Sequence, residues 1–248
     1  MKVVPDTETR FQLNSEGNDV VWDSTMEWII GPYDEYAVEE AIKIVETHGG
    51  EVTTITIGKG NEEKSIRKAM AMGVDKGILV VNEQLADSDP ISIAHALADL
   101  TKPLEPDIIF TGKMATDSSD SFVGPAVAEI LGYPSIAEVS GLEVSPDGLV
   151  ATRDAAGRKE KFESKYPVVI TADKGLNEPR YPKLPMIMKA KKKPLDKLDS
   201  VSTPVTKNVT QTKAEFPPKR EAGELIKGTV DEIVGKLVDG LQNKEKVI

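Results

Sequence analysis

The chain has 248 residues, of which 39% are hydrophobic and 29% are charged, and its formal net charge is −10. The apolar content suffices for a folded core, and the acidic balance argues against nucleic acid as the main partner. The absence of cysteine excludes disulfides, thiolate-bound metals and a thiol nucleophile. No apolar run approaches the roughly 18–20 residues of a membrane span, so we expect no direct membrane insertion.

Apolar, β-branched runs alternate with helical patterns through the first two thirds of the chain. In chain order, the pattern predicts a helix at 34–47, a strand at 52–58, a helix at 62–72, a strand at 77–81, a helix at 91–100, a strand at 107–112, a helix at 122–131 and a strand at 167–172. Asp34 is expected to cap the first helix. Continuous apolar strands between helices are typical of a parallel sheet covered on both faces. The predicted fold class is therefore α/β, with a Rossmann-like, mostly parallel sheet.

The pattern changes twice after this core. Residues 141–164 alternate apolar and polar side chains around turn signals at 146–148 and 156–157, which predicts an antiparallel insertion at the sheet edge, at about 139–164. From Lys174, about 45 residues carry few strand or helix signals, which indicates a linker or a functional loop. An amphipathic helix is expected at about 230–241. We divide the chain into residues 1–173 and 174–248.

Two loops follow the carboxyl ends of predicted strands, where open α/β sheets bind ligands. They are 58–61 (GKGN) and 112–124 (GKMATDSSDSFVG). Glycines, serine hydroxyls and the start of the next helix could hold a nucleotide phosphate. Neither loop matches GxxxxGK[ST] or GxGxxG, and a turn with a helix cap explains the same residues. His48 and His95 have no companions at metal-ligand spacing, and no Ser-His-Asp arrangement can be built, so no catalytic residue is predicted.

The segment 176–193 (LNEPRYPKLPMIMKAKKK) combines prolines, apolar residues and a run of lysines. A hydrophobic protrusion beside cations is typical of a docking surface. The alternative is a linker whose apolar residues pack internally and whose lysines are solvated. Composition favours neither interpretation.

Residues 171–194 (TADKGLNEPRYPKLPMIMKAKKKP) strongly resemble the signature of the electron transfer flavoprotein β-subunit family. Further matches follow in order: KVVPDTE at 2–8, GPYDEYAVEEA at 31–41, IRKAMAMGVDKGILV at 66–80 and PDIIFTGKMATD at 106–117. The resemblance covers nearly the whole chain. It implies a fold of the adenine nucleotide alpha hydrolase-like, ETF β type. Residues 1–173 would form the nucleotide-binding domain, and 174–248 a recognition loop and an extended C-terminal arm that contacts an α subunit.

The resemblance also implies a function. The family's β subunit forms a heterodimer with a larger ETF α subunit, which holds most of a shared FAD. In the non-bifurcating branch, which the signature resembles, β also binds AMP in a structural role. The pair accepts electrons from acyl-CoA or related dehydrogenases of fatty acid oxidation and passes them to the ETF-quinone oxidoreductase. The subunit is an electron carrier without catalytic residues, and its location would be the cytoplasm of a prokaryote or the mitochondrial matrix of a eukaryote.

Residue roles follow by matching motifs. Tyr33 would approach the FAD ring, and Leu184 would anchor the partner dehydrogenase. The AMP-binding residues so implied are Gly31, Pro32, Tyr33, Asp34, Ile57, Gly112, Lys113, Met114, Ala115, Thr116, Asp117, Ser118, Ser119, Asp120, Ser121, Phe122 and Val123. The docking residues so implied are Leu184, Pro185, Met186, Ile187 and Met188, within a recognition loop of about 177–191.

Three features depart from the family pattern. The family's first strand precedes the motif that begins at Lys2, whereas Met1 directly precedes Lys2 here. Without that strand the sheet would have two unpaired edges and would lose stability. Gly31 replaces the usual asparagine. Phe122 and Val123 replace an amide and a hydroxyl side chain, which leaves backbone N–H groups to bind a phosphate.

Two other functions stay open. The chain could be a stand-alone nucleotide-binding or nucleotide-hydrolysing α/β protein built on the same sheet. It could also be the β subunit of a flavin-bifurcating flavoprotein, with a second FAD in place of AMP.

Overall fold

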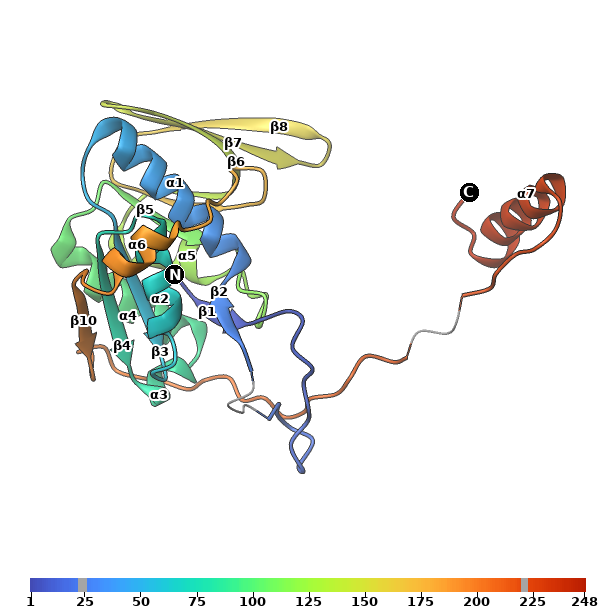
Figure 1. The fold of residues 1–248 in the computed structure, drawn as a ribbon, viewed down its shortest axis with the longest axis horizontal. Coiled ribbons are helices and arrows are strands. Elements are labelled where there is room, and N and C mark those ends of the chain that lie inside the picture. The colour runs from blue at the N-terminus through green and yellow to red at the C-terminus, as the bar shows by residue number, and fades with distance from the viewer. Residues whose placement is uncertain (22–25, 220–222) are drawn as a thin grey trace.

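The structure is a computed structural model that describes residues 1–21, 26–219 and 223–248 (Figure 1). The strands are β1 (Val3–Pro5), β2 (Trp28–Ile30), β3 (Thr53–Gly58), β4 (Lys76–Val81), β5 (Ile108–Gly112), β6 (Ser135–Ser145), β7 (Gly148–Ala155), β8 (Arg158–Ser164), β9 (Val168–Ala172) and β10 (Leu195–Leu198). The α-helices are α1 (Pro32–His48), α2 (Glu63–Met72), α3 (Glu83–Ala86), α4 (Pro90–Thr101), α5 (Val123–Leu131), α6 (Leu184–Ala190) and α7 (Val230–Asp239). A 3₁₀ turn, η1 (Lys102–Leu104), follows α4, and a π turn, η2 (Gly240–Lys244), follows α7.

The described strands form three sheets. β10, β4 and β3 are parallel, and β5, β9 and β6 are parallel in a second sheet, which β7 and β8 extend in the antiparallel direction. β1 pairs with β2 in a small antiparallel sheet. This arrangement confirms the α/β class, with mostly parallel strands and an antiparallel edge insertion.

The parallel strands fall into two separate sheets, one that ends at β3 and one that begins at β5. Among the described strands, β3 and β5 are each the terminal strand of their own sheet. Residues 3–5, from the first matched motif, form β1 and pair with β2 instead of entering a parallel sheet. The terminal ammonium group of Met1 donates a hydrogen bond to the Ile55 carbonyl of β3 at 3.0 Å. The N-terminus therefore contacts the edge of β3.

The predicted cap of the first helix is wrong. α1 begins after Gly31, with Pro32 at its first position, and Asp34 lies inside the first turn. Proline suits this position because its missing N–H would have no partner within the helix. The carboxylate of Asp34 is turned back to accept the backbone N–H of Lys2 at 3.2 Å. Asp34 thus joins α1 to the N-terminal segment.

The segment after Lys174 is more regular than expected. It contains α6, and β10, which pairs in parallel with β4 from Leu195↔Gly77 to Leu198↔Val80. Further along the chain, α7 confirms the C-terminal amphipathic helix (Figure 1). The division of the chain after residue 173 stays a prediction, although β10, beyond that point, belongs to a sheet of the α/β core.

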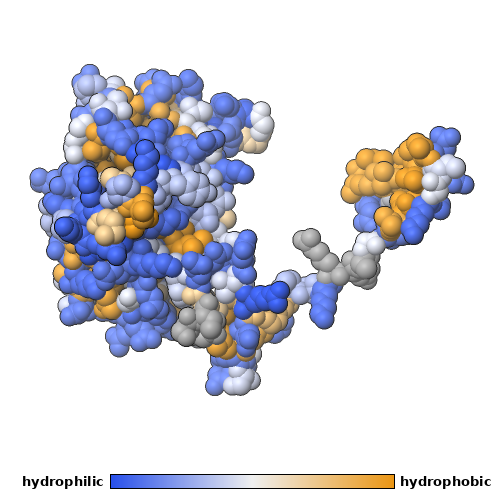
Figure 2. Space-filling view, in the orientation of Figure 1, coloured by the Kyte–Doolittle hydropathy of each residue, from blue (hydrophilic) through white to orange (hydrophobic). Residues whose placement is uncertain are grey.

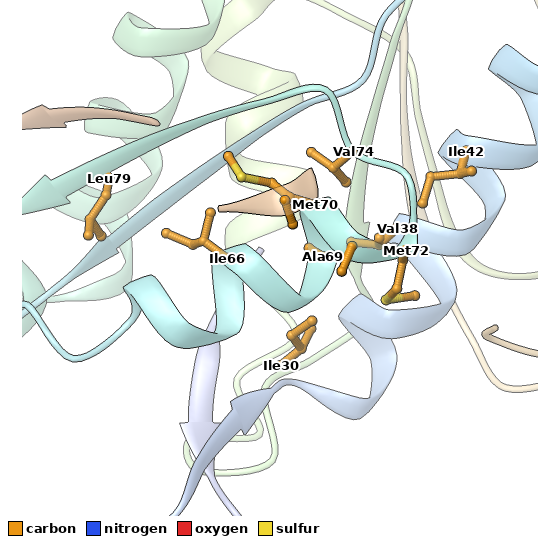
Figure 3. Packing of buried hydrophobic residues seen from close by; sticks show 11 residues of the cluster. Ile30, Val38, Ile42, Ile66, Ala69, Met70, Met72, Val74 and Leu79 are labelled. Carbon is orange, nitrogen blue, oxygen red and sulfur yellow. The ribbon is translucent and has the colours of Figure 1, made fainter. Parts of the chain in front are cut away.

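The largest part of the core lies between α1, α2 and β4 (Figure 3). Buried residues of this cluster include Ile30, Val38, Ile42, Ile66, Ala69, Met70, Met72, Val74 and Leu79. Gly73 ends α2 with φ 155°, and a Cβ there would lie 2.8 Å from Ile42 Cγ2. Only glycine permits both this backbone conformation and the close approach of α1. Among the described helices, none is both long enough and apolar enough to cross a bilayer.

Candidate functional site

The start of α1 and the end of β5 meet closely. A Cβ on Gly112 would lie 2.9 Å from both Asp34 N and Tyr33 Cβ, so glycine is required for this contact. Lys113 Nζ lies 5.0 Å from the centroid of the Tyr33 ring and 3.0 Å from Asp173 Oδ2. The structure therefore brings together two of the matched motifs, 31–41 and 106–117, around Tyr33.

Asp34 is the buried charge at this contact. Burial raises the pKa of its carboxyl above the ordinary value, while the terminal ammonium, 3.8 Å away, and the backbone N–H of Lys2 act in the opposite direction. A Cβ on Gly31 would lie 2.7 Å from Asp34 Oδ2. Gly31, the departure from the family pattern, therefore leaves the space that the Asp34 carboxylate occupies.

The loop between β5 and α5 supplies polar groups at the same end of the sheet. Lys2 Nζ pairs with Asp117 at 2.8 Å, and Ser119 N donates to the Ala115 carbonyl at 2.8 Å. Val123 is the first residue of α5, so its N–H and that of Gly124 have no acceptor within the helix. Beside them, the buried hydroxyl of Thr111 has no hydrogen-bond partner within residues 1–21, 26–219 and 223–248. The loop thus retains backbone donors in spite of the changes at 122 and 123.

The other candidate phosphate loop, 58–61, is already occupied by an acid. The carboxylate of Glu62 accepts the backbone N–H of Lys59 at 3.0 Å and that of Gly60 at 2.8 Å. These are the donors that a phosphate would need. The interpretation of 58–61 as an open phosphate loop is therefore wrong. Ile57, the residue before it, is half-buried against the cluster of Val80, Leu85 and Ala96.

The predicted docking residues lie on α6 and not on an irregular loop. Leu184 is 73% exposed, Ile187 and Met188 are exposed too, and Tyr181, just before the helix, is 93% exposed. Ala190, the last residue of α6, is buried in the core. The linker interpretation, in which the apolar residues pack internally, is therefore wrong for Leu184, Ile187 and Met188.

Two cations hold α6 against α2. Arg67 Nη1 donates to the carbonyls of Ala190 at 2.9 Å and Lys193 at 2.7 Å. Lys193 Nζ donates in return to the carbonyls at the end of α2, including Val74 at 2.6 Å. Each cation thus satisfies carbonyl groups at the C-terminus of the other helix. Lys193 is therefore not simply a solvated member of the lysine run.

The C-terminal helix α7 presents an apolar face to solvent, visible at the right of Figure 2. Val230, Val234, Leu237 and Val238 are all exposed, and no residue of the helix is buried. A capping box between Thr229 and Glu232 fixes the start of the helix.

The two histidines lie on different helices. His48 lies in the last turn of α1 and His95 within α4. Among the described residues, no group of three or more histidine, aspartate or glutamate side chains could hold a metal ion.

The fold and these surfaces define an α/β protein with a polar loop at the end of β5 and two exposed apolar surfaces, on α6 and α7. Residues 19–203 match the family profile described as electron transfer flavoprotein domain. The chain is 40% identical to the electron transfer flavoprotein subunit beta of Bacillus subtilis, covering 100% of this chain and 98% of that protein. It is 34% identical to the Mus musculus subunit of the same description (96% and 94% covered), and 36% identical to the mitochondrial Arabidopsis thaliana subunit (84% and 84% covered). The chain belongs to the electron transfer flavoprotein β-subunit family.

Proposed function

We propose that this chain is the β subunit of a heterodimeric electron transfer flavoprotein. With its α subunit it would accept electrons from dehydrogenases, of which acyl-CoA dehydrogenases are the first candidates, and pass them to a quinone oxidoreductase. Its place would be the cytoplasm of a prokaryote or the mitochondrial matrix of a eukaryote. FAD, held mainly by the α subunit, supplies the redox chemistry when bound, so no residue of β has to act as an acid, base or nucleophile.

The exposed apolar face of α6 is the observation that carries this proposal. Leu184 protrudes from a helix that Arg67 and Lys193 fix to the body of the protein. Burial of one leucine side chain in a complex contributes roughly 1.5–3 kcal/mol. Such a small contact suits a partner that binds, transfers electrons and leaves quickly.

The C-terminal arm is proposed as a contact with the α subunit. α7 has ten residues, and isolated helices shorter than about 12–15 residues are marginal in water. Among residues 1–21, 26–219 and 223–248, nothing buries its apolar face. Packing on a permanent partner would stabilise the helix and remove Val234 and Leu237 from water.

The residues at the start of α1 fit the proposed nucleotide and flavin roles. Tyr33 would lie near the FAD ring, with Lys113 against its ring face. The backbone N–H groups of Val123 and Gly124 and the hydroxyl of Thr111 would hold polar groups of AMP. The remaining AMP-binding residues named from the family motifs, including Ile57, stay predictions.

Cofactor extraction from the purified heterodimer tests the proposal most directly. One FAD with one AMP supports it, whereas two FAD molecules support a bifurcating flavoprotein. ATP turnover by this chain alone would support a stand-alone nucleotide-hydrolysing protein.

The docking role is tested by Leu184→Ala. We expect slower reduction of the flavin by an octanoyl-CoA-reduced acyl-CoA dehydrogenase, with unchanged FAD content and unchanged melting temperature, because the side chain is 73% exposed. Unaltered transfer kinetics would contradict the docking role of α6.

A further inference from the structure

A charge cluster fixes the segment that precedes α6. The guanidinium group of Arg180 donates to Glu39 through Nε at 2.9 Å and Nη2 at 2.9 Å, and to Glu46 through Nη1 at 2.6 Å and Nη2 at 2.9 Å. The backbone N–H of Arg180 also donates to Glu39 Oε2 at 3.1 Å. One arginine thus engages two carboxylates with the paired geometry that makes such contacts strong and directional.

The two acceptors lie on one face of α1. Glu39 and Glu46 are separated by 46 − 39 = 7 residues, close to two helical turns. The side chain of Glu39 is 5% exposed and that of Glu46 is 57% exposed. The hydrogen bonds to Glu46 and, to a smaller extent, to Glu39 raise the pKa of Arg180 above its usual range. The contact to Glu39 therefore cannot be lost without leaving a charge buried.

A second attachment lies three residues earlier. Asn177 Nδ2 donates to the Tyr36 carbonyl at 2.9 Å and to Glu40 Oε2 at 2.8 Å. Between α1, α2 and residues 179–181 lies a cleft of about 190 Å³. The segment 177–183 is therefore joined to α1 by directed polar contacts from Asn177 and Arg180, beside this cleft.

These contacts complete the support of the docking helix. Arg67 and Lys193 hold its C-terminal end, whereas Leu184 is its first residue and lies at the opposite end. Arg180 is four residues before Leu184 and is the charged contact nearest to it along the chain that reaches α1. Arg180 thus fixes the chain to α1 four residues before Leu184.

We propose that Arg180, through Glu39 and Glu46, is a positioning residue that holds segment 177–183 and Leu184 in the docking conformation before the dehydrogenase arrives. This inference rests on the proposed docking function of α6. Without Arg180, the segment would have to be ordered during binding, which lowers affinity without changing the flavin environment. Lysine would restore one charge but not the paired geometry with two carboxylates, so it would restore the function only in part.

The test uses the full chain in complex with its α subunit and three variants, Arg180→Gln, Arg180→Lys and Lys159→Gln. Lys159 is an exposed residue of β8, and its replacement removes one positive charge as a matched control. The first measurement is amide hydrogen exchange over residues 177–191 with no dehydrogenase present. The second is the rate of flavin reduction against the concentration of octanoyl-CoA-reduced acyl-CoA dehydrogenase.

We expect Arg180→Gln to accelerate exchange over 177–183 and to raise the half-saturating dehydrogenase concentration roughly tenfold, at an unchanged limiting rate and FAD content. Arg180→Lys should lie between this variant and the wild type, and Lys159→Gln should match the wild type. Should Arg180→Gln fail to fold, Glu46→Gln at the exposed end of the cluster should give a smaller shift in the same direction.

Unchanged exchange in Arg180→Gln would overturn the inference, because the segment would then be held by other contacts. Faster exchange with an unchanged half-saturating concentration would overturn it too, and would leave Arg180 a purely structural residue. The proposed docking function fails separately if Leu184→Ala transfers electrons normally, whatever the exchange measurement shows for Arg180.

Discussion

Two helices, α6 and α7, expose apolar faces, but within the described part of the chain only α6 is attached to the body of the protein by side-chain hydrogen bonds. α6 has seven residues, and capping cations from Arg67 and Lys193 fix it to the body. α7 has ten residues, none of them buried, and it lies apart from the α/β core (Figure 1). A preformed surface costs little ordering on binding, which suits a partner that comes and goes. A helix that gains its packing only from another chain suits a permanent partner.

The largest expected effect concerns α7. Replacing both Val234 and Leu237 by aspartate places charges on the face that we assign to the α subunit. We expect the heterodimer to be lost, measured by co-purification of the α subunit and its FAD. Lys236→Asp, on the same helix but outside the apolar face, is the control and should retain the complex. A stable complex in the double variant would show that α7 is not the permanent contact.

The next largest effect concerns the anchor of α6. Arg67→Gln removes the donor to the carbonyls of Ala190 and Lys193. Hydrogen bonds that involve a charged group contribute about 1.5–3 kcal/mol each, so we expect the loss of the two to lower the unfolding free energy by about 3–6 kcal/mol. Chemical denaturation of the purified chain measures it. Lys64→Gln, on an exposed part of the same helix, should change the free energy by less than about 0.5 kcal/mol.

A smaller effect concerns how the melting temperature of wild type and of Arg180→Gln changes as the pH is lowered. The hydrogen bond from Arg180 lowers the pKa of Glu46. A carboxyl group with a lowered folded-state pKa stabilises the fold above its unfolded pKa of about 4.3, and this contribution is lost as the pH falls through the folded value. The difference in melting temperature between wild type and Arg180→Gln should therefore be constant from about pH 7 to pH 5 and shrink below about pH 4. A difference that grows on acidification would refute the assignment.

The smallest effect concerns the start of the C-terminal arm. Asp89 accepts the N–H of Ser92 at 2.9 Å, and also Asn208 Nδ2 at 2.7 Å from the arm. Asp89→Asn should release the arm locally, because an amide accepts fewer of these bonds. Trypsin should then cut more rapidly after Lys207, while the complex through α7 persists. Asp147→Asn, in the β6–β7 turn, should leave the cleavage rate unchanged.

The parallel core was accessible from the sequence because its signals are local. Apolar runs ending in glycine predicted β3 and β5, and helical spacing predicted α1 and α2. β10 was missed because LDKL is short and mixed in polarity, and only its pairing with β4 makes it a strand. α6 was missed because prolines dominate its surroundings.

The supports of the candidate site depend on contacts between distant residues. Arg67 reaches Lys193 across 126 positions, and Arg180 reaches Glu39 across 141. In the sequence, Glu39 and Glu46 look like members of a solvated helix face, and nothing local distinguishes them. Asp34 was mistaken for a cap because the local pattern cannot show that its carboxylate turns back to Lys2.

Glu62 gives the turn after β3 a property of its own. Its carboxylate lies on the N–H groups of Lys59 and Gly60, in the way an added anion would. The turn thus carries its own counter-ion as part of the polypeptide. We therefore expect the conformation of residues 58–61 to stay the same at low and at high concentrations of nucleotide or inorganic phosphate.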